Sequence, residues 1–312
     1  MAAFNLTSSA PSILILNGIP GLETAHIWIS IPFFILYILC LLANSTVLFV
    51  VGKEETLHKP MYLLLCMLAL TDISMSTCVM PKALCIFWFG FKEITGEGCL
   101  TQMFFFHVTA ATHSGILAAM GFERYIAISE PLRYGSILTN VRAASLALVG
   151  LTRSALFFLP VLFLLLRLPF CINRVIQHTY CEHMAILKIL CVDTTVNQRY
   201  ALVILLVFTV VDLGLIVLFY ALIIRAVLRI SSQKAHQKAL NTCTAHVCVI
   251  IMSYTSNLFT SLTHRFGEGI GAHVHIILAN LYVVIPPMLN PIIYGIKTKE
   301  LRGKVGKYVC RM

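Results

Sequence analysis

Charged residues are scarce in this chain. Of its 312 residues, 12% are Asp, Glu, Lys or Arg, whereas 59% are hydrophobic, and the mean hydropathy is +0.88. Soluble domains contain about 25% charged residues, so the composition excludes a soluble protein and predicts a membrane protein. The net charge of +10 is not accompanied by a polar, aromatic-rich basic domain for nucleic acid. Basic cytoplasmic loops explain this charge better, and we expect no nucleic-acid partner.

Signals of several other protein classes are also missing. The first 25 residues lack a basic segment followed by a long apolar one, so no cleavable signal peptide is expected. There is no internal repeat, which weighs against many transporters. No zinc-finger or His-Glu-x-x-His spacing indicates a metalloenzyme. We therefore expect no enzyme activity, no cofactor and no metal, and a transporter or channel is kept as an alternative of another class.

Seven apolar runs are long enough to cross a bilayer, since a spanning helix needs about 20 residues. The predicted fold class is an all-α membrane protein, a seven-transmembrane helix bundle over 26–296. An extracellular N-terminus (1–25) precedes it, and a short amphipathic cytoplasmic helix and tail (297–312) follows it. The second outer loop, about 166–195, is long for a bundle connection. The runs are roughly 26–51, 60–87, 99–129, 142–165, 196–229, 239–263 and 273–296.

Basic residues set the orientation in the membrane. With the N-terminus outside, the inner loops and tail hold fifteen Lys and Arg residues and the outer side holds seven, in agreement with the positive-inside rule. Asn5, in the sequon Asn5-Leu6-Thr7, then lies where it can be glycosylated. This orientation predicts a multi-pass plasma-membrane protein. It also places four cysteines in oxidising space, where three pairings are open: Cys99, Cys171, Cys181 and Cys191.

Polar residues within the apolar runs are candidate functional positions. Such residues face the interior of a bundle or a wet cavity, because exposure to hydrocarbon is costly. Three prolines in the last run are expected to break that helix and to free backbone groups. The polar residues are Asn44, Asp72, His113, Arg153, Asp212 and Asn290, and the prolines are Pro286, Pro287 and Pro291.

Three motifs resemble those of rhodopsin-like G-protein-coupled receptors: Leu68-Ala69-Leu70-Thr71-Asp72, Glu123-Arg124-Tyr125 and Asn290-Pro291-Ile292-Ile293-Tyr294. Four stretches resemble odorant receptors more narrowly: Pro60-Met61-Tyr62, the run from Met120 to Tyr134, the run from Lys238 to His246, and the run from Pro286 to Tyr294. Two further stretches resemble the class I, fish-like branch: Ile19 to Glu23 and Thr263 to Gly267. The resemblance extends from about residue 20 to residue 305.

The resemblance implies a signalling mechanism. Arg124 would be held near Glu123 at rest and would reach into a cavity that opens when the sixth helix moves outward, where a G-protein tail inserts. The implied partner is a stimulatory olfactory-type G protein that raises cAMP. The implied disulfides are Cys99–Cys181 and Cys171–Cys191, and the implied polar core is Asn44, Asp72 and Asn290, with His113 beside it. The implied coupling and switch residues are Glu123, Arg124, Tyr125, Tyr220, His246, Tyr254, Asn290, Pro291 and Tyr294.

The sequence departs from the receptor pattern at three positions. Tyr254 stands where most rhodopsin-like receptors have a tryptophan, so the trigger is expected to be local hydrogen bonding. His113 stands where class I receptors commonly have an acid, which makes a poorer sodium site because sodium needs hard oxygen ligands. A protonated His113 is instead expected to pair with Asp72. Arg153, on the fourth helix, has no assigned role.

Class I receptors tend to bind small polar odorants, often acids, and the chain offers matching side chains. Arg265 ends the sixth helix and suits a carboxylate, and Ser261 shares its face. His107 lies eight residues, about 12 Å, inward of Cys99. Our hypothesis is a medium-chain carboxylate with its head on Arg265. The expected apolar walls are Phe106, Ala110, Phe158, Val161, Leu202, Leu258 and Ile277.

Alternatives remain for these ligand residues. Arg265 is either a ligand contact or a membrane-edge anchor, and His107 either contacts the ligand or only bonds a neighbour. His183, which follows Cys181 closely, is a candidate for a lid over the pocket. A non-olfactory chemosensory receptor for a small metabolite is the alternative within the receptor class.

Overall fold

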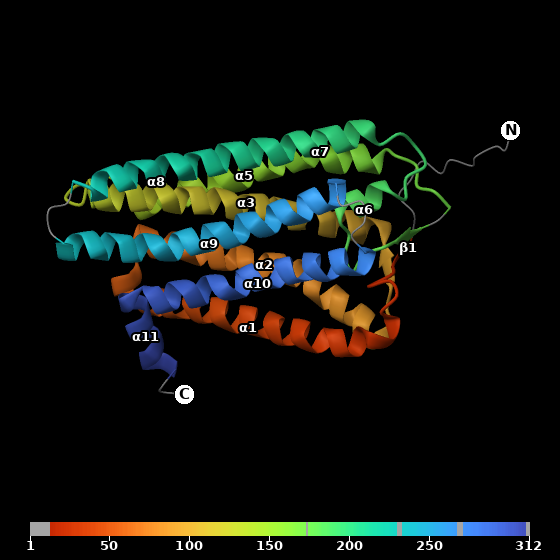
Figure 1. Ribbon diagram of the computed structural model, residues 1–312, viewed down its shortest axis with the longest axis horizontal. Helices are drawn as coiled ribbons and strands as arrows, with labels where there is room; N and C mark the ends of the chain where they lie inside the picture. The colour runs from red at the N-terminus through yellow and green to blue at the C-terminus, as the bar shows by residue number, and fades with distance from the viewer. Residues whose placement is uncertain (1–12, 173, 230–232, 267–270, 310–312) are drawn as a thin grey trace.

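The chain folds into a bundle of seven membrane helices, so the predicted fold class is confirmed. The computed structural model describes residues 13–172, 174–229, 233–266 and 271–309. Within these residues, six helical stretches are long and apolar enough to cross a membrane, and the remaining membrane helix, the sixth in chain order, has a shorter apolar part, Cys243–Phe259. The strand β1 (Ile13–Leu16) and the short helix α6 (His183–Leu187) lie at one end of the bundle, and α11 (Lys299–Val309) lies at the other (Figure 1).

The boundaries of the helices agree with the predicted apolar runs to within three residues, except that the sixth helix begins six residues before its predicted start. The fifth membrane helix is continuous but contains a π-helical segment, η3, between α7 and α8. The membrane helices are α1 (His26–Lys53), α2 (Pro60–Phe89), α3 (Gly96–Ser129), α5 (Asn140–Leu166), α7 (Thr195–Phe208) with η3 (Thr209–Leu213) and α8 (Gly214–Val227), α9 (Gln233–Phe266) and α10 (Ala272–Lys297). Short connecting elements are η1 (Glu23–Ala25), η2 (Glu55–Leu57) and α4 (Tyr134–Ile137).

Local sequence signals explain where several helices begin and end. The side chain of Thr95 accepts a hydrogen bond from Gly98 N and caps α3, and Thr139 caps α5 by accepting from Arg142 N. Such caps satisfy backbone N–H groups that have no partner within the helix. Gly90 ends α2 in the left-handed conformation, with φ of 67°, which glycine adopts without steric cost.

The prolines of the last membrane helix do not break it, and this prediction is wrong. Pro286, Pro287 and Pro291 all lie inside α10, which is continuous. Because proline has no N–H group, Pro291 leaves the carbonyl of Pro287, four positions earlier, without its helical donor. The Asn44 Nδ2 of α1 donates to this carbonyl at 2.9 Å. A side chain from another helix therefore compensates for the missing backbone bond.

A small sheet closes the outer end of the bundle, which the all-α prediction did not include. β1 pairs antiparallel with β2 (Glu93–Thr95) and parallel with β3 (Val175–Ile176). Leu14 and Leu16 are fully buried, whereas Ile13 and Ile15 are exposed, the two-residue alternation of a strand. The apolar residues before the first membrane helix thus form a strand that joins two outer loops.

Two disulfides hold the second outer loop against the bundle. Cys99, in the first turns of α3, is bonded to Cys181, and Cys171 is bonded to Cys191. These are the pairs that the family resemblance implies. The first bond ties the loop to α3 and the second closes a 20-residue segment within it. The loop is therefore fixed over the outer ends of the helices.

The tail helix α11 packs against the cytoplasmic end of α1. Leu301 is fully buried there. Glu54, directly after α1, forms ion pairs with Lys304 and Lys307 and accepts a hydrogen bond from the Tyr308 hydroxyl. These lysines lower the pKa of Glu54 to about 2. The apolar side of the predicted amphipathic helix thus contacts protein, and its acidic partner directly after α1 was not anticipated.

Candidate functional site

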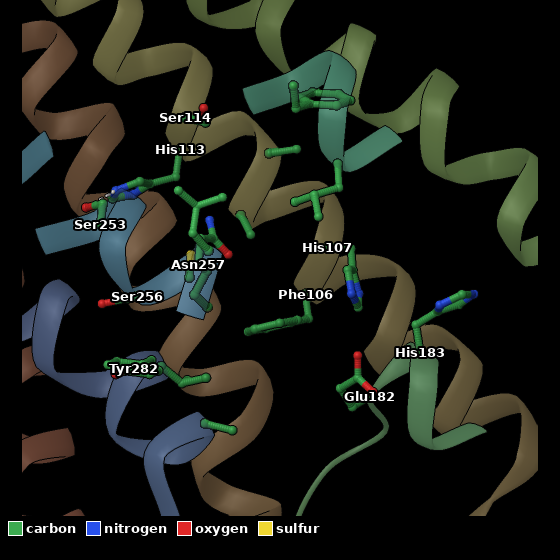
Figure 2. Close-up of a pocket in the computed structure, with 18 of the residues that line it drawn as sticks. Phe106, His107, His113, Ser114, Glu182, His183, Ser253, Ser256, Asn257 and Tyr282 are labelled. Atoms are coloured by element: carbon green, nitrogen blue, oxygen red, sulfur yellow. Dashed lines mark hydrogen bonds between the residues drawn. The ribbon is translucent and has the colours of Figure 1, made fainter. Parts of the chain in front are cut away.

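A cavity of about 220 Å³ lies inside the outer half of the bundle. It is enclosed by α3, α5, α7, α9 and α10, and α6 of the second outer loop contributes to its wall (Figure 2). Seven of the residues predicted for the ligand pocket line it: Phe106, His107, Ala110, Phe158, Val161, His183 and Leu258.

Two of the predicted wall residues do not line the cavity. Leu202 belongs to α7, but the cavity is lined from that helix by Ala201, Ile204, Leu205 and Phe208. These four positions follow the i, i+3, i+4, i+7 spacing of one helix face, and Leu202 lies off that face. Ile277 of α10 packs on the core beside the cavity instead. The side chains of Ser261 and Arg265, and the whole of Asn5, lie outside the described residues.

His107 both bonds a neighbour and faces the cavity, so the two alternatives for it are not exclusive. Its Nδ1 lies 2.8 Å from the Met103 carbonyl oxygen, one turn earlier in α3. Phe106 and Phe158 lie against its ring, each with 5.4 Å between ring centroids. When Nδ1 donates to the carbonyl, Nε2 is left for a ligand, and it becomes a donor when the imidazole is protonated.

The outer end of the cavity also contains an acid that the sequence did not single out. Glu182 is 8% exposed, and its carboxylate accepts a hydrogen bond from Ala185 N at 2.9 Å, which caps α6. Burial raises the pKa of Glu182, against the opposing effects of His107 and His275. His183, the next residue, is also buried. One acid and two imidazoles therefore lie at the outer end of the cavity, at Glu182, His183 and His107 (Figure 2).

The deep end of the cavity leads into a polar network that joins four membrane helices. Arg153 of α5 makes a bidentate ion pair with Asp212 of η3, with N–O distances of 2.6 and 2.8 Å. Ser114 of α3 donates to the same carboxylate at 2.8 Å and shares a 2.6 Å hydrogen bond with the Tyr254 hydroxyl of α9. Arg153 also lies over the ring of Phe208, 4.4 Å from its centroid.

The role of Arg153 is therefore to neutralise Asp212, and sequence reasoning missed this. The sequence did contain a signal for this ion pair, because the basic Arg153 and the acidic Asp212 occur at membrane depth in neighbouring apolar runs. Asp212 is 1% exposed and lies in a π-helical segment, a distortion frequent at functional sites. The extra residue per turn in η3 changes which side chains face inward.

The polar core contains a smaller set of direct contacts than the resemblance implies. Asn290 donates to both oxygens of Asp72, at 3.0 and 3.1 Å. His113 Nδ1 lies 3.3 Å from Asp72, as expected for the pairing of these residues, and its Nε2 is 3.4 Å from Ser253 Oγ. Asn44 instead bonds the carbonyl oxygens of Cys40 and Pro287, so it contacts the backbone of α10 rather than the aspartate.

At the cytoplasmic end, Arg124 is restrained by its neighbour. Its Nε lies 3.4 Å from a Glu123 carboxylate oxygen, and both side chains are buried. Tyr134, in the following loop, donates to the other oxygen of Glu123 at 2.8 Å. Burial raises the pKa of Tyr134, with the nearby Glu123 adding to the effect, so its hydroxyl keeps its proton. Pro291 of α10, another of the implied coupling residues, is also buried.

In the part of the chain that the structure describes, the tyrosines implied in switching form no hydrogen bond to this arginine. The Tyr220 hydroxyl lies 2.9 Å from His246 Nδ1, which joins α8 to α9. The Tyr125 ring stacks on Phe219 at 6.3 Å. Tyr294 of α10 is 1% exposed and packs within the cytoplasmic core. The described residues thus show Arg124 paired with Glu123, the arrangement implied for the resting state.

Comparisons with known proteins agree on one family. Residues 33–312 match the family model described as olfactory receptor. The chain is 49% identical to human olfactory receptor 52B2, over 98% of this chain and 94% of that protein. It is 49% identical to human olfactory receptor 52P1, over 98% and 95%. Squid rhodopsin has a similar fold, with a TM-score of 0.71 at 14% identity, covering 93% of this chain and 86% of that one.

Proposed function

The chain belongs to the olfactory receptor family of G-protein-coupled receptors, and we propose that it detects small carboxylic acids. It is a multi-pass plasma-membrane receptor and not an enzyme, and its partners are a small-molecule ligand and a G protein. We propose further that the G protein is of the stimulatory olfactory type, so that ligand binding raises cAMP.

The dimensions of the cavity support a small, partly apolar ligand. A dry cavity of about 150 Å³ holds benzene, and this cavity has about 220 Å³. Its middle section is lined by apolar side chains, including Phe106, Val161 and Leu258. A medium-chain acid has a hydrocarbon tail that suits these walls and a head that needs a polar partner.

The position of His107 is the observation that carries the acid proposal. Its Nδ1 faces the Met103 carbonyl, so a protonated ring presents Nε2–H to the cavity as a charged donor. Hydrogen bonds between charged groups are about twice as strong as neutral ones. Arg265, near the outer end of α9, is proposed as the second cationic partner of the head group, on the basis of its position in the helix.

Glu182 limits how an acid can bind, because an ionised carboxylate there repels another. Burial raises the pKa of Glu182, which favours its neutral form. A neutral Glu182 donates a hydrogen bond to a carboxylate and no longer repels it. The acid proposal therefore requires that Glu182 be protonated, or compensated by His107, when the ligand is bound.

Tyr254 is proposed as the point where the ligand acts on the receptor. It lines the cavity and also bonds Ser114, so a ligand that displaces its ring disturbs the contact between α9 and α3. Because α9 carries His246, which interacts electrostatically with Arg124 and lies within hydrogen-bond distance of Tyr220, movement of this helix would open the cytoplasmic end. This connects ligand binding to release of Arg124 from Glu123.

A cAMP assay with matched acids, alcohols and esters of graded chain length tests the proposal. His107→Ala and Arg265→Ala should each raise the half-maximal concentration for acids by roughly 10-fold or more, since a hydrogen bond to a charged group contributes about 1.5–3 kcal/mol. Lys188→Ala, which removes an exposed cation outside the cavity, is the matched control. Unchanged acid responses in both His107→Ala and Arg265→Ala would refute the ligand assignment.

The G-protein assignment has its own test. Arg124→Ala, with surface expression measured by antibody staining, should abolish the cAMP rise. A wild-type receptor that responds to acids by another second messenger, with no cAMP rise, contradicts the stimulatory assignment without affecting the ligand class.

A further inference from the structure

The inner part of the ligand cavity contains polar groups without a protein partner. Asn257 of α9 lines the cavity, and its carboxamide has no hydrogen bond to any other residue within the described part of the chain. Thr209, the first residue of η3, also lines the cavity, and the same holds for its hydroxyl. Figure 2 shows Asn257 between Ser114 and Phe106 among the lining side chains.

Most other polar side chains in this region are already bonded. Ser253 lies within hydrogen-bond distance of His113, and Ser256 donates to the Met252 carbonyl. Ser114 is shared between Asp212 and Tyr254. Asn257 and Thr209 differ from these because they keep their full bonding capacity toward the cavity. Asn257 keeps an exposed surface, and polar side chains at membrane depth face the bundle interior or a wet cavity and are candidate functional positions.

The hydrogen bond between Ser114 and Tyr254 sets the depth of Asn257 relative to His107. Asn257 lies three residues, about 4.5 Å, outward of Tyr254 on α9. His107 lies seven residues, about 10 Å, outward of Ser114 on α3. Asn257 is therefore roughly 6 Å deeper than His107 along the bundle axis, and it is on a different helix.

The geometry points to a second polar subsite, made by Asn257 and Thr209, that binds a hydroxyl or carbonyl group on the chain of the ligand. The inference rests on the proposed acid function and specifies its ligand class: a medium-chain hydroxy or oxo carboxylic acid. With carbon–carbon bonds of about 1.5 Å in a zigzag, a 6 Å depth difference needs about five bonds or more between the two polar groups. The carboxylate lies near His107, and the second group reaches Asn257.

The chemistry of Asn257 explains why a simple fatty acid fits less well. A carboxamide has two N–H donors and one acceptor oxygen. A methylene group of a fatty acid placed against it displaces water and does not replace the hydrogen bonds that the amide made to that water. A site that is built to bond a hydroxyl discriminates against the analogue that lacks it. A ligand hydroxyl both donates to and accepts from Asn257, and the Thr209 hydroxyl offers a further partner.

The test is a scan of hydroxyl position in the full-length receptor, measured by cAMP. The probes are octanoic acid and its hydroxy derivatives, with the hydroxyl beside the carboxylate, in the middle of the chain or at the far end. We expect the middle or far position to be preferred over octanoic acid by about fivefold to tenfold, since a hydrogen bond contributes about 1 kcal/mol and the amide offers more than one. The position beside the carboxylate should give no gain.

Two variants locate the preference. Asn257→Leu removes the amide at similar volume and should abolish the preference for the hydroxy acids over octanoic acid, measured as the ratio of their half-maximal concentrations. Thr209→Val should reduce the preference. Thr152→Val, an exposed threonine of α5 outside the cavity, is the control and should change neither response. Surface staining is measured for each variant.

The outcomes separate this inference from the acid proposal. If octanoic acid is active and no hydroxy acid is preferred, or if the preference survives in both Asn257→Leu and Thr209→Val, the second subsite is refuted. If all acids are inactive, the acid proposal fails, and the same scan on the methyl esters then decides the subsite alone. If Asn257→Leu does not reach the surface, the wild-type scan and Thr209→Val together decide whether the subsite exists.

Discussion

The ion pair between Arg153 and Asp212 provides the most direct test of the bundle's internal energetics. Asp212 is 1% exposed, and the side chain of Arg153 is 27% exposed. Two N–O contacts, of 2.6 and 2.8 Å, join them. Arg153→Leu removes both donors and leaves a buried carboxylate with the Ser114 hydroxyl as its remaining side-chain donor.

The expected loss of stability follows from this geometry. Removing one member of a buried ion pair costs about 3–5 kcal/mol because the other charge is left without compensation. The remaining bond from Ser114 places Arg153→Leu at the lower end, at about 3 kcal/mol. At about 2 °C per kcal/mol for a large domain, the melting temperature should fall by roughly 6 °C. Asp212→Leu should cost less, because the partly exposed Arg153 is free to extend toward a more polar region.

Thermal unfolding of the purified receptor in nanodiscs measures these differences. The double variant, Arg153→Leu with Asp212→Leu, should recover most of the loss, since apolar residues of similar volume can replace a buried ion pair at little cost. Arg167→Leu, at the exposed end of the same helix, is the control and should change the melting temperature little. The reasoning would be refuted if the double variant melted at as low a temperature as Arg153→Leu. It would also be refuted if Arg153→Leu melted at the same temperature as the wild type.

Three further predictions concern signalling and folding. Tyr254→Phe removes a hydrogen bond to α3 that contributes about 1 kcal/mol; basal cAMP should rise about fivefold at equal surface expression, and an unchanged basal level contradicts the trigger assignment. Replacing Cys171 and Cys191 by serine opens a 20-residue loop and should cost about 3 kcal/mol, seen as reduced surface staining at physiological temperature; full expression would oppose this. Because burial raises the pKa of Glu182, its neutral form is kept to a higher pH than that of an ordinary glutamate and is lost as pH rises further, so acid potency should fall with rising pH. Glu182→Gln should raise potency at the upper pH and weaken this dependence; an unaltered pH profile counts against the role of Glu182.

The number, order and orientation of the membrane helices were predictable from the sequence. A bilayer requires about 20 apolar residues for each spanning helix, so the hydropathy of the chain defines the spans with little dependence on packing. The asymmetry of basic residues similarly orients the chain, because loop charges act before the helices assemble. The motifs around Asp72, Arg124 and Asn290 then pointed to the receptor family.

The inward face of each helix was harder to predict. Leu202 was expected in the cavity wall, but α7 is apolar on most of its surface, so its pattern does not distinguish the cavity face from the lipid face. His107 and Phe106 were placed well, because the depth and the polar character of His107 defined one face of α3. Asn257 was overlooked because nothing in the sequence shows that its amide lacks a partner.

Only the tertiary structure decided which distant residues pair. Arg153 and Asp212 are 59 positions apart and lie on different helices, and Asn44 bonds the carbonyl of Pro287 across 243 positions. Such contacts depend on how helices pack and rotate, which hydropathy does not encode. The sequence by itself determined the seven-helix bundle and its orientation, because the membrane acts on each segment separately. The partners of the buried polar groups follow from helix packing, because an unsatisfied group inside a bilayer must find its partner in another helix.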